Sequence, residues 1–208
     1  MEEMLLLIRD AITAGDEDAA KKLVGEALKA GLEPRNIMER AMMPAMEDIG
    51  ERFSRNEAFI PELIVAAAAM QEGMQLLKPL LTAGEKGSGK VVLGTVYGDI
   101  HSIGKNLVRM CMEGAGFEVI DLGEDLKTEV FVEAYKEYSP DILGLSALLS
   151  STMQRMKEVI DAVRVIDPSA LIMVGGAPVT SDYAIEIGAS GYASNAFEAA
   201  MNAKELIV

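Results

Sequence analysis

The chain has 208 residues, half of them apolar, and a formal net charge of −14 at pH 7. This charge argues against nucleic acid as a partner, because phosphate binding depends on clustered Lys and Arg. No apolar stretch is long enough to span a membrane, and the first residues, MEEMLLLIRD, lack the basic start of a secretory signal. The single cysteine, Cys111, excludes a disulfide framework and favours a reducing, cytoplasmic location.

Residues 1–82 carry helix signals and almost no strand signal. Apolar residues recur at helical spacing in four segments. The first covers residues 4–13, and the second begins after its cap, Asp16, and ends at Gly31. The third and fourth begin at Pro34 and Pro61. Pro44 is expected to kink or restart the third helix, and the fourth is expected to reach residue 81. Four helices with short connections predict a small bundle.

Residues 83–90 are rich in Gly, Ser and Lys and are interpreted as an interdomain linker. Gly84, Gly89 and Lys90 have the spacing of a phosphate-binding loop, but Val91 stands where Ser or Thr should hold magnesium. The segment also precedes a strand, whereas a phosphate-binding loop follows one. Phosphate binding is therefore rejected here.

From Val91 onward, strand and helix signals alternate. Candidate strands cover residues 91–96, 118–122, 142–146, 171–174 and 191–193, and candidate helices cover 103–113, 128–138, 152–166, 181–187 and 196–206. This alternation predicts an α/β domain with a doubly wound parallel sheet, most simply in the flavodoxin-like order 2-1-3-4-5. The first and third strands would then be neighbours, so His101 and Ser146 would flank one crevice.

The loop after the first strand carries Asp99 and His101, the only histidine in the chain. Ligands bind at the carboxyl ends of strands in open α/β sheets, and a carboxylate beside an imidazole suggests a metal ligand with its orienting partner. A turn with a solvated histidine is the alternative. One imidazole cannot hold a bare metal ion, so a metal here requires a macrocycle, such as haem or a corrinoid, for its other ligands.

Three sequence signatures resemble those of cobalamin-binding domains: Asp99-Ile-His101-Ser-Ile-Gly104, Leu145-Ser146-Ala147-Leu148 and Val174-Gly175-Gly176-Ala177. With the helical segment before them, they make the chain similar to methyltransferase-associated corrinoid proteins, including the cobalamin module of methionine synthase and the methanol- and methylamine-type corrinoid proteins. The resemblance implies a helical cap bundle over residues 1–82 and a Rossmann-type cobalamin-binding domain over residues 91–208.

The resemblance also implies a site. His101 replaces the cofactor's own base as the lower axial ligand of cobalt, and Asp99, His101 and Thr152 form a ligand relay. Thr152 could also simply cap the helix that follows it, and the two roles can coexist. Small residues would leave room for the displaced nucleotide tail. The implied cofactor-binding positions besides Asp99 and His101 are Gly98, Ile100, Ser102, Ile103, Gly104, Ser146, Leu148, Ser150, Gly175, Gly176, Tyr192 and Ala193.

Within the helical segment, the resemblance puts Phe53, Ile60 and Leu63 over the upper, methyl-bearing face of the corrin, where apolar side chains would exclude water. Such a cap has to swing away before the methyl group can reach another active site, and residues 82–90 are the expected hinge. Ser190 and Asn195 stand where relatives often have Asp, which weakens the expected contacts of the last loop.

The function implied is that of a methyl carrier, a non-catalytic corrinoid subunit that cycles through methylcobalamin. Cobalt(I) would accept a methyl group from a substrate-specific methyltransferase, and methyl-cobalt(III) would donate it to a second methyltransferase. A reductive activase is a further candidate partner. The methyl donor is left open among methanol, methylamines, betaines and aryl methyl ethers.

Other functions remain open. A cobalamin-binding mutase subunit would share the sheet domain but has no place for the helical cap. A regulator would need a DNA-binding module, and a phosphoacceptor receiver domain would need an Asp where the third strand ends at Ser146. A cobalamin storage or sensor module is the remaining alternative.

Overall fold

The computed structural model describes residues 2–77, 79–80 and 87–207. The chain divides into two compact units. The helical unit lies within Met1–Gly87 and also takes in Gly114–Gly116, and the sheet unit comprises Ser88–Glu113 and Phe117–Val208. Most of the predicted linker and hinge, residues 82–86, lies outside the described residues. No helix in the described part of the chain has both the length and the hydropathy needed to cross a membrane.

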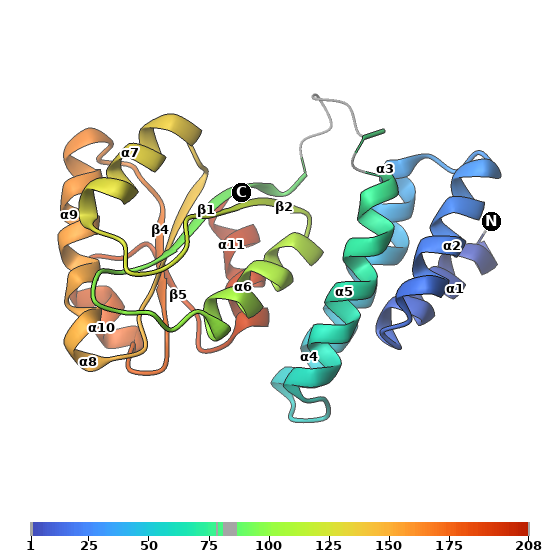
Figure 1. The fold of residues 1–208 in the computed structure, drawn as a ribbon, viewed down its shortest axis with the longest axis horizontal. Coiled ribbons are helices and arrows are strands. Elements are labelled where there is room, and N and C mark those ends of the chain that lie inside the picture. The colour runs from blue at the N-terminus through green and yellow to red at the C-terminus, as the bar shows by residue number, and fades with distance from the viewer. Residues whose placement is uncertain (1, 78, 81–86, 208) are drawn as a thin grey trace. The chain divides into compact units, whose positions relative to one another are not determined.

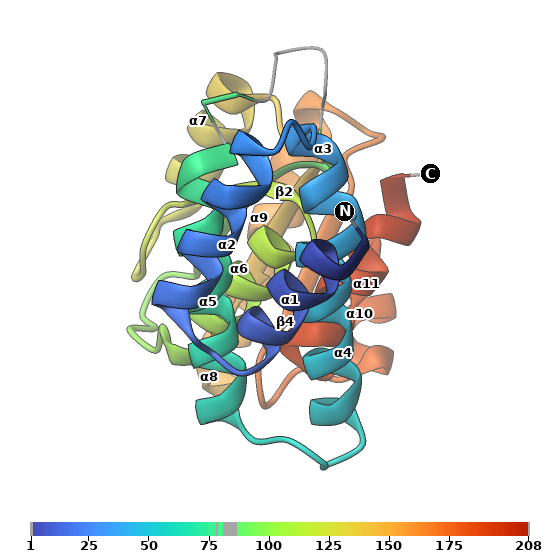
Figure 2. The ribbon, with the colours of Figure 1, turned by 90° about the vertical axis from the view of Figure 1, so that its right-hand side faces the viewer.

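The helical unit contains the predicted bundle. Its elements are α1 (Glu2–Thr13), α2 (Glu17–Lys29), α3 (Pro34–Ile37), the π-helical turn η1 (Met38–Met42), α4 (Met43–Ser54) and α5 (Ile60–Leu77). α1 packs against α2 and α4, and α5 packs against the same two helices (Figure 2). The carboxylate of Asp16 accepts a hydrogen bond from the Ala19 N–H (2.9 Å), which is the predicted cap of α2.

The third predicted helix is divided into α3, η1 and α4. Pro44 lies in the first turn of α4, where its missing N–H is tolerated, so the helix restarts there as expected. The widened turn η1 immediately precedes this restart. The end predicted for the fourth helix is wrong: α5 stops at Leu77, and Pro79 and Leu80 form a turn because proline cannot donate a helical hydrogen bond.

The sheet unit confirms the predicted fold class. Five parallel strands lie in the order β2-β1-β3-β4-β5: β1 (Gly89–Thr95), β2 (Phe117–Asp121), β3 (Ile142–Ser146), β4 (Ile172–Gly175) and β5 (Gly191–Tyr192). The connecting helices are α6 (Ile103–Gly114), α7 (Thr128–Tyr138), α8 (Ser150–Met153), α9 (Arg155–Ile166) and α10 (Ser181–Glu186), and α11 (Ala196–Ile207) follows the last strand. α6 and α11 cover one face of the sheet, and α7, α9 and α10 cover the other (Figure 1).

One core cluster of the sheet unit lies on the face covered by α7, α9 and α10. Phe131 of α7 and Ile160 of α9 are fully buried there against Val92 and Leu143. The helix predicted over residues 152–166 is interrupted at Gln154, which separates α8 from α9. At this break, the hydroxyl of Tyr183 donates to the carbonyl of Met153 (2.9 Å). This hydrogen bond connects the end of α8 to α10.

Candidate functional site

The loop between β1 and α6 lies beside the end of β3. In the sheet register, Thr95 pairs with Ser146, so the residues that follow the two strands meet at the carboxyl edge. Asp99 is fully buried on this loop, whereas the His101 side chain is 45% exposed. The predicted neighbourhood of the first and third strands is therefore present.

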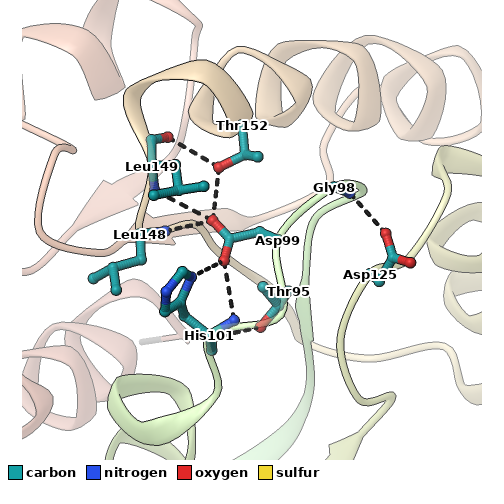
Figure 3. A network of polar contacts seen from close by, with 8 residues as sticks. All are labelled: Thr95, Gly98, Asp99, His101, Asp125, Leu148, Leu149 and Thr152. Carbon is teal, nitrogen blue, oxygen red and sulfur yellow. Dashed lines mark hydrogen bonds and ion pairs between the residues drawn. The ribbon is translucent and has the colours of Figure 1, made fainter.

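Both oxygens of the Asp99 carboxylate accept hydrogen bonds, as Figure 3 shows. Oδ1 accepts from the backbone N–H of His101 (3.0 Å) and lies 2.8 Å from His101 Nδ1. Oδ2 accepts from the Thr152 hydroxyl (2.6 Å) and from the backbone N–H groups of Leu148 (2.8 Å) and Leu149 (3.2 Å). Asp99 thus joins the histidine loop to the segment after β3.

These contacts favour the ionised form of Asp99. Burial alone would raise the pKa of Asp99, but the hydrogen bonds from Thr152, Leu148 and His101 outweigh it and hold that pKa well below its usual range. Because an ionised carboxylate can only accept, His101 Nδ1 must carry the proton that lies between them. In the neutral imidazole Nε2 then has a free lone pair, and no hydrogen bond from a described residue reaches it.

Thr152 is not a helix cap, so that alternative is wrong. α8 begins at Ser150 with Leu149 at the N-cap position, and Thr152 is the third residue of the helix. Its side chain is 53 residues from Asp99 in sequence but in direct contact with it, and its hydroxyl also lies 2.9 Å from the Leu149 carbonyl. The Asp99–His101–Thr152 arrangement expected of a relay is thus present as geometry.

The loop after β2 forms hydrogen bonds with the loop that carries His101. This contact between the two loops was not predicted from the sequence. Asp125 accepts a hydrogen bond from the Gly98 N–H (2.8 Å) through its side chain and donates its own N–H to the Asp99 carbonyl (2.9 Å). Leu126 donates to the Thr95 carbonyl (3.1 Å), and Thr95 donates to the Gly123 carbonyl (3.0 Å). Asp125 has a φ of +56°, which residues other than glycine adopt uncommonly.

Apolar side chains are exposed on the same two loops. Ile100 (70% exposed) and Ile103 (81% exposed) flank His101, and Leu148 lies on the loop after β3. Tyr97 and Leu149 are exposed as well. A single polar ligand atom surrounded by exposed apolar groups suits a large, flat, largely apolar molecule.

The glycines of the signatures differ in what surrounds them. A Cβ on Gly104 would have no heavy atom within 4 Å, and one on Gly175 would meet only the Ala193 carbonyl at 3.8 Å. A Cβ on Gly176 would lie 1.8 Å from the Ala147 carbonyl, and Gly176 has a φ of +126°. Gly104 and Gly175 therefore leave open space, whereas the backbone itself requires glycine at position 176.

The remaining predicted positions are dispersed. Ser146, Tyr192 and Ala193 are half-buried at the ends of β3 and β5, Ser102 precedes α6, and Ser150 is exposed at the start of α8. Phe53, Ile60 and Leu63 belong to the helical unit, where Leu63 is fully buried and Ile60 is exposed. Their role over a cofactor stays a prediction.

Ser190 and Asn195, the departures from the family pattern, have structural roles. Ser190 Oγ accepts from the Ile172 N–H (3.0 Å), and Asn195 accepts from the Glu198 N–H (2.9 Å) at the start of α11. Glu198 in turn accepts from the hydroxyl of Ser194 (2.7 Å). This reciprocal capping fixes the loop after β5.

We expect Gly175→Leu to weaken, by about tenfold or more, binding of the corrinoid that the sequence resemblance implies, while the protein stays folded, because the leucine would fill space that is now open. Absorbance titration of the apoprotein with hydroxocobalamin measures the first effect, and urea unfolding the second. Gly176→Ala is the contrasting variant: its clash with Ala147 should destabilise the fold itself. Unchanged affinity in folded Gly175→Leu would mean that Gly175 belongs only to a turn.

The donor set defines a class of binding site. Among the described residues, no three His, Cys, Asp or Glu side chains gather to hold a metal ion. The available donor is one imidazole nitrogen with an oriented lone pair, beside open space and exposed apolar groups. The residues therefore fit a metal already held in a macrocycle, and fold and site together define a protein that binds such a cofactor at the carboxyl edge of a flavodoxin-like sheet.

Comparison with known proteins identifies the family. Residues 89–201 match a family model described as a B12 binding domain, and residues 7–78 match a second model of the same description. The chain is 42% identical to the dimethylamine corrinoid protein of Methanosarcina barkeri over 99% of this chain and 98% of that relative. It therefore belongs to the family of B12-binding corrinoid proteins, which confirms the predicted resemblance and the corrinoid cofactor.

Two solved structures share the fold over nearly the whole chain. One is the methanol:cobalamin methyltransferase complex MtaBC from Methanosarcina barkeri, with a TM-score of 0.87, 30% identity and coverage of 99% of this chain and 80% of that one. The other is a cobalamin-binding protein from Desulfitobacterium hafniense DCB-2, with a TM-score of 0.82, 32% identity and coverage of 98% of each chain.

Proposed function

We propose that this protein is a methyl carrier that binds a corrinoid through His101 and passes a methyl group between two methyltransferases. The observation that supports the proposal is the partly exposed imidazole of the only histidine, which the buried Asp99 holds through Nδ1 so that Nε2 is available as a ligand. When bound, the corrinoid supplies the cobalt atom on which the methyl group travels. The protein supplies the axial ligand, its orientation and the surrounding surface.

The relay has a defined part in this proposal. A metal bound to Nε2 would withdraw electron density from the imidazole ring and make its Nδ1–H more acidic. The proton on Nδ1 would then be shared more strongly with Asp99. Thr152 donates to the other carboxylate oxygen and so balances the charge that Asp99 carries. Asp99 and Thr152 thereby set how strongly His101 binds, without touching the cofactor metal themselves.

The partners follow from the relatives. One relative is named for dimethylamine, and one solved structure is a methanol:cobalamin methyltransferase complex. The identity to the dimethylamine corrinoid protein extends over 99% of this chain, so a methylamine is the methyl donor to test first. The proposed partners are the methyltransferase for that methylamine and an acceptor methyltransferase. A reductive activase is a further proposed partner. We also propose a cytoplasmic location, because the free, buried Cys111 suits a reducing compartment.

The mutase alternative is less well supported. The helical residues 7–78 themselves match a B12-binding model, so the helical unit is part of the corrinoid protein and not an unrelated addition. A mutase subunit built on the sheet domain alone gives these residues no role.

Reconstitution tests the proposal. Protein labelled with ¹⁵N-histidine, loaded with cobalamin and reduced to cobalt(II), should bind about one corrinoid per chain and show ¹⁵N hyperfine coupling from the imidazole. After a chemical reductant has brought the cobalt to cobalt(I), the holoprotein should become methylated when supplied with dimethylamine and the corresponding methyltransferase, with methylamine as the leaving product. It should then lose the methyl group to an acceptor methyltransferase. Coupling from the cofactor's own base in wild-type protein would overturn the assignment of His101.

A further inference from the structure

Lys105 places a cation where the local structure disfavours one. It lies in the first turn of α6, and its side chain is only 3% exposed. The N-terminus of a helix carries partial positive charge, and removing an ammonium group from water costs free energy. Its compensation is the carboxylate of Asp121 at the end of β2, with a weaker contact to Asn106 Oδ1 at 3.4 Å.

Asp121 links this cation to the loop that supports the histidine. The same oxygen that meets Lys105 accepts the N–H of Gly123 (3.0 Å), and the Gly123 carbonyl accepts the N–H of Thr95 (3.0 Å). Two residues later, Asp125 bonds to the backbone of Gly98 and Asp99. The loop after β2 therefore contacts the segment before His101, and Asp121 at its base is paired with Lys105, four residues after His101.

We propose that the ion pair between the buried Lys105 and the half-buried Asp121 is a positioning device for His101. It ties the start of α6 to the base of the loop after β2, so the histidine loop is held at both ends and Nε2 keeps one direction. Neither side chain acts as a ligand. The inference depends on the proposed role of His101 as axial ligand.

Stability alone does not account for this pair. Replacing a buried ion pair with apolar side chains of similar volume is often neutral or stabilising, because the desolvation of two charges is no longer required. What the apolar pair lacks is direction: it fills space but does not fix the distance between α6 and the base of the loop after β2. Geometry, and not folding free energy, is therefore what the ion pair contributes.

The test compares Lys105→Met/Asp121→Asn with wild type, both loaded with hydroxocobalamin. The double variant removes both charges, whereas the amide oxygen of Asn can still accept the Gly123 N–H. We expect the midpoint of urea unfolding to be equal or higher, the apparent affinity for corrinoid to fall about tenfold, and the share of cobalt(II) protein with ¹⁵N-histidine coupling to fall. Lys157→Met is the matched control, because it removes an exposed lysine paired with Asp161 on α9 of the same unit. It should match wild type in all three measurements.

A second variant separates positioning from folding. Gly123→Ala leaves the ion pair intact but strains the loop, because Gly123 has a φ of +96° while no atom crowds its Cβ position. It should also lower the share of histidine-coupled cobalt. Wild-type coupling in either folded variant, or failure of the double variant to fold, would overturn the inference. If wild-type protein itself shows the cofactor's own base on cobalt, the proposed function fails first.

Discussion

We expect His101→Ala to abolish protein-derived nitrogen coupling in the cobalt(II) state while some corrinoid stays bound. The imidazole is the only histidine ligand that the chain offers, so no other side chain of this type replaces it. The open space at Gly104 and Gly175 is unchanged in the variant. Loss of one metal ligand should weaken corrinoid binding about 10–100-fold. Electron paramagnetic resonance and absorbance titration measure the two effects.

Rescue by a small molecule provides the control for this variant. Imidazole added to His101→Ala should enter the volume that the side chain leaves and restore nitrogen coupling, now from an unlabelled ligand. Thr152→Val should retain coupling from His101, because it removes a hydrogen bond to Asp99 and not the ligand. Histidine-like coupling in His101→Ala without added imidazole would contradict the assignment.

The second large effect is expected from Asp99→Asn. An amide keeps the shape of the carboxylate but has an NH2 group in place of one acceptor oxygen. Whichever way the amide turns, this NH2 group faces donors, either those of His101 or those of Leu148, Leu149 and Thr152. Leaving such buried donors unpaired should lower the free energy of unfolding by about 1–3 kcal/mol at pH 7. Urea unfolding of the apoprotein measures this difference.

The difference in free energy of unfolding between wild type and Asp99→Asn should become smaller at low pH. The pKa of Asp99 is lower in the folded than in the unfolded state, so its carboxylate stabilises the fold at pH values above the unfolded pKa of about 3.9 and loses that effect as pH falls below it. The gap between wild type and Asp99→Asn should therefore be constant from pH 7 to pH 5 and shrink below about pH 4. Asp161→Asn, which alters an exposed ion pair with Lys157, should cost less than about 1 kcal/mol. An equal gap at pH 3 and pH 7 would contradict the role given to Asp99.

Most of the sheet could be predicted because its signals are local. The strands are short β-branched or apolar runs, and the prediction for β3 matches residue by residue. The break at Gln154 was missed because neither Gly nor Pro marks it, and the residues on both sides keep helical spacing. Likewise, nothing in residues 38–42 distinguishes a π turn from an α-helical one before Pro44.

The site was predictable where side chains carry the chemistry, and not where the backbone does. His101 and Asp99 stand out as residue types, whereas the N–H groups of Leu148 and Leu149 have no signature in the sequence although they help to hold Asp99. The Lys105–Asp121 pair was missed for another reason. Its partners are 16 residues apart on α6 and β2, and only the packing of that helix on the sheet brings them together.

The contact between Thr152 and Asp99 spans 53 residues of chain, and this stretch includes two strands of the sheet, β2 and β3. On the ribosome, the histidine segment emerges long before the residues that orient it. Contacts of such long range form only after the loop between them has closed, so they come late in folding. The axial ligand therefore gains its orientation only when β3 has joined β1 and α8 has formed, and capture of the cofactor should follow the folding of the sheet unit instead of guiding it.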